Sequence, residues 1–234
     1  MISVCVATYN GEKYLKEQLD SILQQLSETD ELIISDDRSC DNTKKILESF
    51  HTDKRIKIID GPQKGVIKNF ENAIRHAKGN IIFLADQDDV WLPNKVAQTK
   101  KIFEEDKNSL VVISDLVIVD KDLVPVEDSY FAYRNVQTGF FKNILKNKYI
   151  GAGMAFRKEL KPAILPFPKA IPMHDMWIGV MAGNRVKLLH EPLTLYRRHG
   201  ENTSEISTTA SFKQQFCWRW ALISSIVKRK IFGK

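Results

Sequence analysis

The chain has 234 residues, of which 43% are hydrophobic and 27% charged, a composition that excludes disordered and fibrous proteins. This length allows one large α/β domain with a full core, or two small domains. The net charge of +6 belongs entirely to the last segment, because residues 211–234 hold six basic and no acidic side chains, while the other 210 residues hold 29 of each sign. The charge therefore describes that segment and gives no reason to expect binding to nucleic acid.

The cysteines and the first residues indicate a compartment. Cys5, Cys40 and Cys217 form no CxxC pair and no metal-binding spacing, which is typical of a reducing environment. The chain runs directly into an apolar strand without a basic signal-peptide region, and no run approaches the ~20 apolar residues of a spanning helix. The sequence therefore predicts a cytoplasmic protein.

The first 84 residues alternate between strand and helix patterns. Apolar runs bounded by turn formers predict strands at residues 2–7, 31–35, 55–59 and 81–84. Helical spacing predicts a helix capped by Asn10, a second capped by Asp41 or Asn42, and a third over residues 66–77. This βαβαβαβ order predicts a mostly parallel sheet with helices on both faces.

The second half is divided into shorter predicted pieces. We expect helices over residues 94–105 and 175–182, and an ordered loop with four prolines over residues 162–172. Short strands are predicted at residues 110–113, 116–119, 186–189 and 193–196. Residues 122–148 give a mixed pattern with no assignment.

The clearest chemical signal is the acidic stretch Asp86-Gln87-Asp88-Asp89, directly after the buried strand 81–84. Ligands of open α/β sheets bind outside the carboxyl ends of the strands. Clustered carboxylates repel one another unless a cation lies between them, and hard oxygen ligands suit Mg²⁺ or Mn²⁺ with substrate phosphates. The alternative is a solvated acidic turn, which an isolated motif of this kind would favour.

Polar residues also follow the first two strands, at the same predicted edge of the sheet. Thr8, Tyr9 and Asn10 end the first strand, and Asp36 and Asp37 end the second. Backbone N–H groups of such a turn can meet a base or phosphate, and a carboxylate can accept from a ribose hydroxyl or a pyrimidine. The alternatives are a simple strand-to-helix turn and pairing of an aspartate with the adjacent arginine. The absence of GxGxxG argues against a dinucleotide dehydrogenase.

Two later segments complete the set. Asp175 opens a predicted helix in apolar surroundings, where a raised pKa would suit a general base, and the same residue is a good N-cap. Arg197, Arg198 and His199 precede a glycine turn, where arginine can pair with phosphate and neutral histidine can ligate a metal. A solvated basic loop is an equal alternative for this last segment.

Five segments together resemble a known family: residues 4–23, 34–43, 85–96, 174–175 and 196–202. They resemble the family 2 glycosyltransferases with the GT-A fold, and most closely the bacterial rhamnosyltransferase-like branch, over about residues 2–205. The resemblance implies a Rossmann-like, mostly parallel central sheet flanked by helices. It also implies one GT-A domain over residues 1–205, with a nucleotide-sugar half at 1–113 and an acceptor half at 114–205, followed by a basic amphipathic tail at 206–234.

The resemblance also implies roles for individual residues. It assigns the nucleotide pocket to Thr8, Tyr9, Asn10, Asp37 (for the base), Lys68 and Asp86, the metal to Asp86, Asp88 and His199, and the role of catalytic base to Asp175. Residues 151–154 would shape the acceptor side. The base motif of the family is often Glu-Asp, whereas this chain has His174-Asp175, which keeps the base and changes its electrostatic surroundings.

The implied activity is inverting and dependent on Mg²⁺ or Mn²⁺. A sugar, with rhamnose as one candidate, would pass from a UDP or dTDP sugar to a hydroxyl of a glycan or lipid-linked acceptor in cell-surface polysaccharide synthesis. One alternative is a non-catalytic nucleotide-sugar-binding or scaffold domain of a membrane-associated assembly complex. Another is a nucleotidyltransferase, which would need a glycine-rich basic first loop, and the first loop here has only Gly11.

The last segment predicts an amphipathic helix. One face carries apolar residues at steps of three or four: Phe212, Phe216, Trp220, Ile223, Val227 and Ile231. Arg219 and Lys230 interrupt this face. A basic helix of this kind can lie on an anionic leaflet, which predicts peripheral attachment to the inner face of the cell membrane. The alternatives are docking on the domain and a dimer contact.

Overall fold

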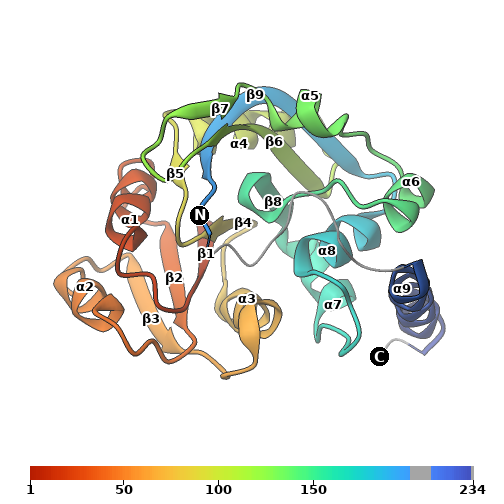
Figure 1. The fold of residues 1–234 in the computed structure, drawn as a ribbon, viewed down its shortest axis with the longest axis horizontal. Coiled ribbons are helices and arrows are strands. Elements are labelled where there is room, and N and C mark those ends of the chain that lie inside the picture. The colour runs from red at the N-terminus through yellow and green to blue at the C-terminus, as the bar shows by residue number, and fades with distance from the viewer. Residues whose placement is uncertain (201–211, 233–234) are drawn as a thin grey trace.

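The computed structural model describes residues 1–200 and 212–232, and it shows one curled sheet flanked by helices (Figure 1). The strands are β1 (Ile2–Thr8), β2 (Glu31–Asp36), β3 (Ile56–Asp60), β4 (Ile81–Asp86), β5 (Val90–Trp91), β6 (Val111–Val119), β7 (Pro125–Glu127), β8 (Met154–Arg157) and β9 (Val186–Arg197). The α-helices are α1 (Leu15–Leu23), α2 (Thr43–Ser49), α3 (Gly65–His76), α4 (Lys95–Glu105), α5 (Tyr130–Arg134), α6 (Phe140–Leu145), α7 (Lys161–Ile164), α8 (His174–Ala182) and α9 (Phe212–Phe232). Two 3₁₀ turns, η1 (Gly151–Gly153) and η2 (Lys158–Leu160), precede and follow β8.

The strand order is β3-β2-β1-β4-β8-β6-β9-β5, and β7 pairs with β6. The first four strands of this order are parallel, as the βα alternation predicts. Beyond them β8 is antiparallel to both its neighbours, while β6 and β9 are parallel. The predicted α/β fold class, with helices flanking a central sheet and a helix at the C-terminal end, is confirmed.

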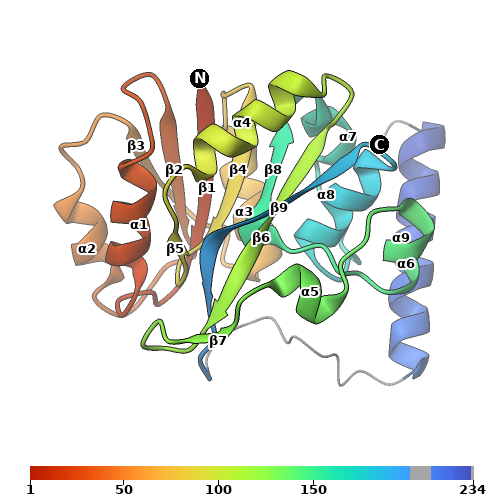
Figure 2. The ribbon, with the colours of Figure 1, turned by 90° about the horizontal axis from the view of Figure 1, so that it is seen from above.

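Alternate residues of the strands pack on opposite faces of the sheet. In β1, Val4 and Val6 join a core with α1, α2 and α4, whereas Cys5 and Ala7 join a core with α3 and α8. Figure 2 shows the two layers of helices on either side of the strands. Because both faces of β1 and β2 are covered, the carboxyl ends of these strands are where their polar residues reach solvent.

The predicted N-cap at Asn10 is wrong. Helix α1 begins five residues later, at Leu15, with Tyr14 at the cap position. Asn10 instead adopts a left-handed backbone conformation with φ of +50°, and its side-chain oxygen accepts a hydrogen bond from the N–H of Cys40. The side chain thus joins two loops rather than capping a helix.

The predicted pairs of short strands are two long strands. Residues 110–113 and 116–119 belong to β6, and residues 186–189 and 193–196 belong to β9. The β6–β9 register shifts near Asp115, opposite Pro192, so the polar residues that divide each sequence pattern lie at a bulge. A bulge changes the alternation of side chains without ending the strand, so the sequence pattern predicts a break where the strand continues.

The region before α8 also differs from the prediction. Lys161–Ile164 form helix α7, which takes up the start of the predicted proline loop, with Pro162 in its first turn where proline is tolerated. Helix α8 begins at His174, and Met173 rather than Asp175 holds the cap position. Asp175 therefore lies in the first helical turn.

Helix α9 docks on the domain beside α6 and α7 (Figures 1 and 2). Leu222 and Ile226 are buried, and the Arg229 guanidinium donates to the carbonyl oxygens of Leu165 and Pro166 at 2.5 Å each. The predicted apolar face points elsewhere: Trp220, Ile223 and Val227 are exposed. The side chains of Phe212, Phe216, Lys230 and Ile231, like the predicted domain boundary at residue 205 and the motif residues 201–202, lie outside the described residues.

None of the helices in the described part of the chain combines the length and hydropathy needed to span a bilayer.

Candidate active site

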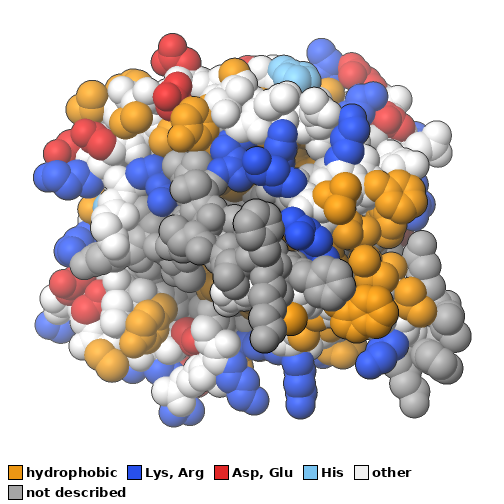
Figure 3. Space-filling view, turned by 45° about the vertical axis from the view of Figure 1, so that its right-hand side comes forward, with side chains coloured by type: hydrophobic (Ala, Val, Ile, Leu, Met, Phe, Trp, Pro, Cys, Tyr) orange, Lys and Arg blue, Asp and Glu red, His pale blue; other side chains and the backbone are white. Residues whose placement is uncertain are grey.

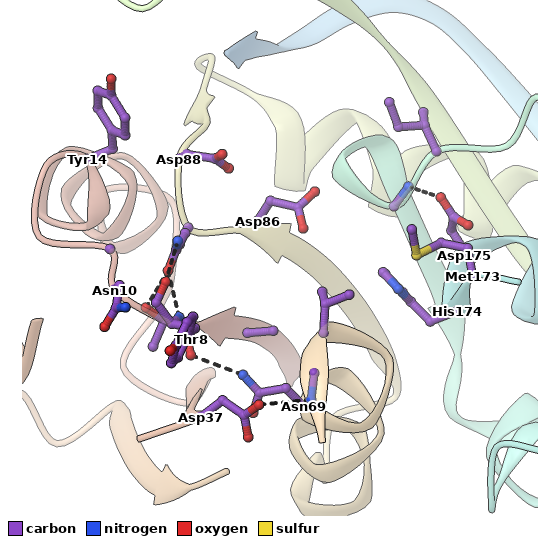
Figure 4. Close-up of a pocket in the computed structure, with 18 of the residues that line it drawn as sticks. Thr8, Asn10, Tyr14, Asp37, Asn69, Asp86, Asp88, Met173, His174 and Asp175 are labelled. Atoms are coloured by element: carbon purple, nitrogen blue, oxygen red, sulfur yellow. Dashed lines mark hydrogen bonds between the residues drawn. The ribbon is translucent and has the colours of Figure 1, made fainter. Parts of the chain in front are cut away.

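One cleft of about 1240 Å³ lies at the carboxyl ends of β1, β2 and β4. The loops after these strands form one side of it, and η1, α8 and the end of β9 form the other (Figure 4). The cleft brings together nearly every predicted site residue: Thr8, Tyr9, Asn10, Asp37, Asp86, Asp88, Asp175 and His199. Residues 167 positions apart in the sequence, Thr8 and Asp175, thus face one space.

Lys68 is the exception. It is not among the lining residues, and its ammonium group donates to Glu71 at 2.5 Å and to the carbonyl oxygen of Phe167 at 2.8 Å. Glu71 also forms an ion pair with Arg75, so Lys68 belongs to an ion-pair cluster on α3. We therefore leave Lys68 out of the proposed donor pocket.

Gln87 ties the acidic loop to the end of β1. Its side-chain oxygen accepts from the hydroxyl of Thr8 at 2.6 Å and from the N–H of Tyr9 at 2.8 Å, while its amide donates to the carbonyl of Tyr9. A Cβ at Gly11 would lie 2.6 Å from the same oxygen, so a larger residue there would displace the Gln87 side chain. Gln87 is a site residue that the sequence pattern does not single out, although it lies between Asp86 and Asp88.

Asp37 is held over the end of β2 by backbone groups. Its carboxylate oxygens accept from the N–H groups of Gln63 at 2.5 Å and Gly65 at 3.0 Å. Behind it, Asn69 donates to the carbonyls of Thr8 and Ser35, and its side-chain oxygen has no partner among the described residues. The loop before α3 therefore positions Asp37 at the edge of the cleft.

The three carboxylates of the acidic loop have different surroundings. Asp86 lies at the end of β4, and burial followed by the charge of Asp88 raises the pKa of Asp86 to about 7. Asp88 contacts His199, with 2.9 Å between its Oδ2 and Nε2 of the imidazole. Asp89 is buried and accepts from the N–H of Arg197 at 3.0 Å, so it supports the turn rather than facing the cleft. Burial, and then Asp88, raises the pKa of Asp89 as well.

Arg197 braces this loop from β9. The side chain is 3% exposed, and it donates to the carbonyl of Asp88, the carbonyl of Lys121 and the carboxylate of Glu17. Its guanidinium also lies over the ring of Tyr14, 4.5 Å from the centroid. Of the two arginines for which phosphate pairing is predicted, Arg197 thus holds the acidic loop instead.

The donor set fits a divalent cation that arrives with a substrate. Within the described residues no group of three His, Cys, Asp or Glu side chains is arranged to hold an ion. Mg²⁺, however, is commonly bound by one or two carboxylates together with substrate phosphates and water. Asp86 and Asp88 supply such a pair, and a cation between them would oppose both the burial and the repulsion by Asp88 that raise the pKa of Asp86.

Asp175 faces these carboxylates from the opposite wall. One oxygen accepts from the N–H of Gly151 at 3.1 Å and the other from the N–H of Met176. Trp177 and Ile178 are fully buried beside it, and burial raises the pKa of Asp175 to about 6. A carboxylate with this pKa is ionised at neutral pH and basic enough to take a proton from a hydroxyl.

Lys95 is a buried cation beneath the site. Its ammonium donates to the carbonyl of Ala152, at 2.6 Å, and to the hydroxyl of Thr194, and it lies 4.7 Å from the centroid of the Trp91 ring. Burial lowers the pKa of Lys95 to about 7, while the charges of Asp89 and Asp86 oppose that change. The residue thus joins the acidic loop, η1 and β9, and its burial could not be read from a polar position at the start of a helix.

The cleft at the strand ends thus has Asp86 and Asp88 on one wall and Asp175 on the other (Figure 4). The sequence model of the family described as Glycosyl transferase family 2 matches residues 3–161, and the chain belongs to this family. It is therefore a glycosyltransferase of the kind that uses nucleotide sugars.

Two curated relatives and one solved structure extend this finding. The chain is 27% identical to the Escherichia coli UDP-Glc:alpha-D-GlcNAc-diphosphoundecaprenol beta-1,3-glucosyltransferase WfgD, covering 81% of this chain and 73% of that one. It is 29% identical to the dTDP-rhamnosyl transferase RfbG of Shigella flexneri, covering 90% and 76%.

The crystal structure of S. aureus TarS 1-349 in complex with UDP-GlcNAc matches with a TM-score of 0.70 and 19% identity, over 97% of this chain and 72% of that one. In another TarS structure of the same range the matched share is 60%. At this identity the likeness concerns the fold.

Proposed function

We propose that this protein is an inverting, metal-dependent glycosyltransferase of cell-surface polysaccharide synthesis. It moves a hexose or deoxyhexose, with rhamnose as one candidate, from a UDP or dTDP sugar to a hydroxyl of a glycan or lipid-linked acceptor. The observation that carries the proposal is the arrangement of the cleft: Asp86 and Asp88 project from one wall, and Asp175 projects from the other (Figure 4).

In this proposal the donor lies along the strand ends. Asp37 receives the base, and Thr8, Tyr9 and Asn10 line the nucleotide. Asp86 and Asp88, with His199 beside Asp88, would hold Mg²⁺ or Mn²⁺, which when bound supplies neutralising charge for the departing nucleoside diphosphate. Their spacing at the end of one strand suits a diphosphate.

Asp175 is the proposed base. Its ionised carboxylate removes the proton of the acceptor hydroxyl, and the oxygen attacks the anomeric carbon from the face opposite the leaving group. The carbon–oxygen bond to the diphosphate breaks as the new glycosidic bond forms, so the configuration inverts in one displacement. The N–H of Gly151 keeps the carboxylate turned toward the cleft.

The printed names of the relatives support the choice of substrates. WfgD is named for UDP-Glc and a diphosphoundecaprenol-linked sugar, RfbG for dTDP-rhamnose, and TarS was crystallised with UDP-GlcNAc. A pyrimidine diphosphate sugar is common to the three, and a polyprenyl diphosphate acceptor appears in one.

A thermal-shift panel tests the proposal against the non-catalytic alternative. Nucleotide sugars are added with and without Mn²⁺, followed by measurement of nucleoside diphosphate release. We expect metal-dependent stabilisation by one donor, and slow release with water as acceptor. Stabilisation without any release, with or without a supplied acceptor, would favour the scaffold alternative, and the absence of stabilisation by any nucleotide sugar would contradict both.

We also propose that α6 and α9 present a membrane-binding surface. Phe141 and Leu145 on α6 are 78% and 63% exposed, and Trp220 and Val227 on α9 are 67% and 47% exposed. Figure 3 shows hydrophobic side chains gathered on this side of the molecule with lysine and arginine around them. Apolar side chains ringed by cations suit an anionic lipid surface.

Vesicle flotation tests this surface without removing the helix, whose inner face carries buried Leu222. The triple variant Trp220→Ser, Ile223→Ser and Val227→Ser should lose binding to vesicles that contain phosphatidylglycerol. A matched control replaces two exposed valines elsewhere, Val124 and Val126, by serine and should bind as the unaltered protein does. Unchanged flotation of the triple variant would contradict the proposal.

A further inference from the structure

His174 lies at the wall of the cleft, and both of its ring nitrogens are buried. The side chain lines the cleft, is 4% exposed, and has no hydrogen-bond partner at Nδ1 or Nε2 among the described residues. Buried polar atoms are almost always hydrogen-bonded, so an unpaired imidazole at the wall of a binding site indicates a partner that arrives with the ligand.

The ring is fixed in place by its neighbours. It stacks on Phe70 of α3, with 4.1 Å between ring centroids and 23° between planes. On the other side Gly151 packs closely against the ring, since a Cβ at this position would lie 3.0 Å from Nε2. Figure 4 shows the imidazole directed from the start of α8 into the cleft. Because its orientation is fixed, the ring can form a hydrogen bond with a ligand atom at one position only.

The chemistry of the ring selects a neutral polar partner. Burial lowers the pKa of His174 to about 3, so the imidazole is neutral at physiological pH, with one donor and one acceptor nitrogen. A sugar hydroxyl both donates and accepts, which matches this ring. A metal role has no support, since no group of three ligating side chains in the described ranges includes it.

The position of the ring places it beside the donor sugar. Phe70 lies on the helix whose first turn packs behind Asp37, on the nucleotide side, while Asp175 is the next residue after His174. A sugar whose anomeric carbon lies between the diphosphate site and Asp175 must therefore lie next to His174.

We propose that His174 determines donor-sugar specificity by hydrogen-bonding one hydroxyl of the sugar ring through its unpaired imidazole. This proposal rests on the proposed function. It assigns a role to the histidine that replaces the glutamate often found before the base.

The test uses His174→Phe, which keeps a flat ring on Phe70 and removes both nitrogens. Calorimetry with Mn²⁺ compares the full donor, its singly deoxygenated analogues and the bare nucleoside diphosphate. We expect the unaltered protein to bind one deoxy analogue about 10–100-fold more weakly than the full donor, and the variant to bind that analogue and the full donor equally. Affinity for the bare nucleoside diphosphate should agree within about twofold between the two proteins.

Two results would overturn the inference. One is equal discrimination among the deoxy analogues by variant and unaltered protein, and the other is an equal loss for the bare nucleoside diphosphate. If no nucleotide sugar binds the unaltered protein, the proposed function itself fails, which separates the two failures.

A second measurement needs no variant, should His174→Phe not fold. In ¹⁵N spectra of the unaltered protein, the full donor should shift the nitrogens of one histidine that stays neutral from pH 8 to pH 5, and the bare nucleoside diphosphate should not. A spectrum without this shift would overturn the inference.

Discussion

On the side of the cleft formed by β1, β2 and β4, polar groups are tied to neighbouring loops, whereas on the side formed by α8 they stand among apolar side chains. Gln87 binds the end of β1, and Asp37 accepts two backbone N–H groups. Across the cleft, His174 has no partner among the described residues, and Asp175, which also accepts two backbone N–H groups, lies beside fully buried Trp177.

The difference matches two tasks. A charged, polar nucleotide is best recognised by dipoles that are already oriented, which costs little reorganisation on binding. The proposed base and sugar-binding histidine instead lie on a wall of apolar side chains, where each hydrogen bond contributes more. Burial raises the pKa of Asp175 on this wall, as it also raises the pKa of Asp86 at the end of β4. Substitutions on the two sides should therefore affect different steps.

The largest expected effect is on turnover in the Asp175→Asn variant. The amide cannot take the proton of the acceptor, so the rate of nucleoside diphosphate release should fall about 10³-fold. Asp122→Asn, at an exposed aspartate outside the cleft, is the matched control and should retain full activity. Turnover like that of the unaltered protein would remove Asp175 from the role of base.

Lys95→Met tests whether the buried ammonium group of Lys95 stabilises the contact between the two walls of the cleft. The change leaves Asp86 and Asp89 without their cation and the carbonyl of Ala152 without a donor, so the free energy of unfolding in urea should fall by about 3 kcal/mol. Lys100→Met, on the exposed face of the same helix, should change it by less than about 0.5 kcal/mol. Equal stabilities of the two variants would show that the ammonium is not needed.

Asp37→Asn addresses the polar wall. The amide keeps the size of the carboxylate but loses its charge and the symmetrical acceptance from Gln63 and Gly65. Nucleoside diphosphate affinity, measured by calorimetry, should fall about tenfold, with turnover at saturating donor unchanged. A fall in turnover at saturation, with affinity preserved, would contradict the division of tasks.

The pH profile of turnover reports on the apolar wall. Because the pKa of Asp175 is raised to about 6, the active ionised form is lost as pH falls through 6, and the rate at saturating donor and metal should be about tenfold lower at pH 5 than at pH 7. Donor affinity followed over the same range serves as the control. A rate that stays constant down to pH 5 would be inconsistent with this base.

The smallest effect concerns stability. The pKa of Asp86 is raised to about 7 in the folded protein, so folding favours its protonated form, and this contribution is lost as pH rises through 7. Asp86→Asn should therefore be more stable than the unaltered protein at pH 8, with no difference below pH 4, as thermal melting at both pH values would show. A less stable variant at pH 8 would mean that a structural role dominates.

Part of the site could be predicted because parallel strands end at one edge. The apolar runs before Thr8, Asp37 and Asp86 predict strands, and the βα alternation makes them parallel, so these residues were expected together and line one cleft. The arrival of Asp175 beside them was expected only through the family resemblance.

The remaining features depend on tertiary contacts. Asn10 takes a cross-loop hydrogen bond with Cys40 instead of a cap, and Lys68 is satisfied by Glu71 on its own helix. In α9 the apolar residues form more than one stripe, and packing selects Leu222 and Ile226 for the core. Periodicity alone cannot decide which of two stripes faces inward.

The most direct test of the central claim is calorimetric titration of the donor, in Mn²⁺, into the Asp175→Asn and Asp88→Asn variants side by side. The account predicts that Asp175→Asn binds the donor within about threefold of the unaltered protein, while Asp88→Asn binds at least about tenfold more weakly and no longer responds to the metal. Loss of donor binding in Asp175→Asn, or metal-dependent binding that persists in Asp88→Asn, would contradict it.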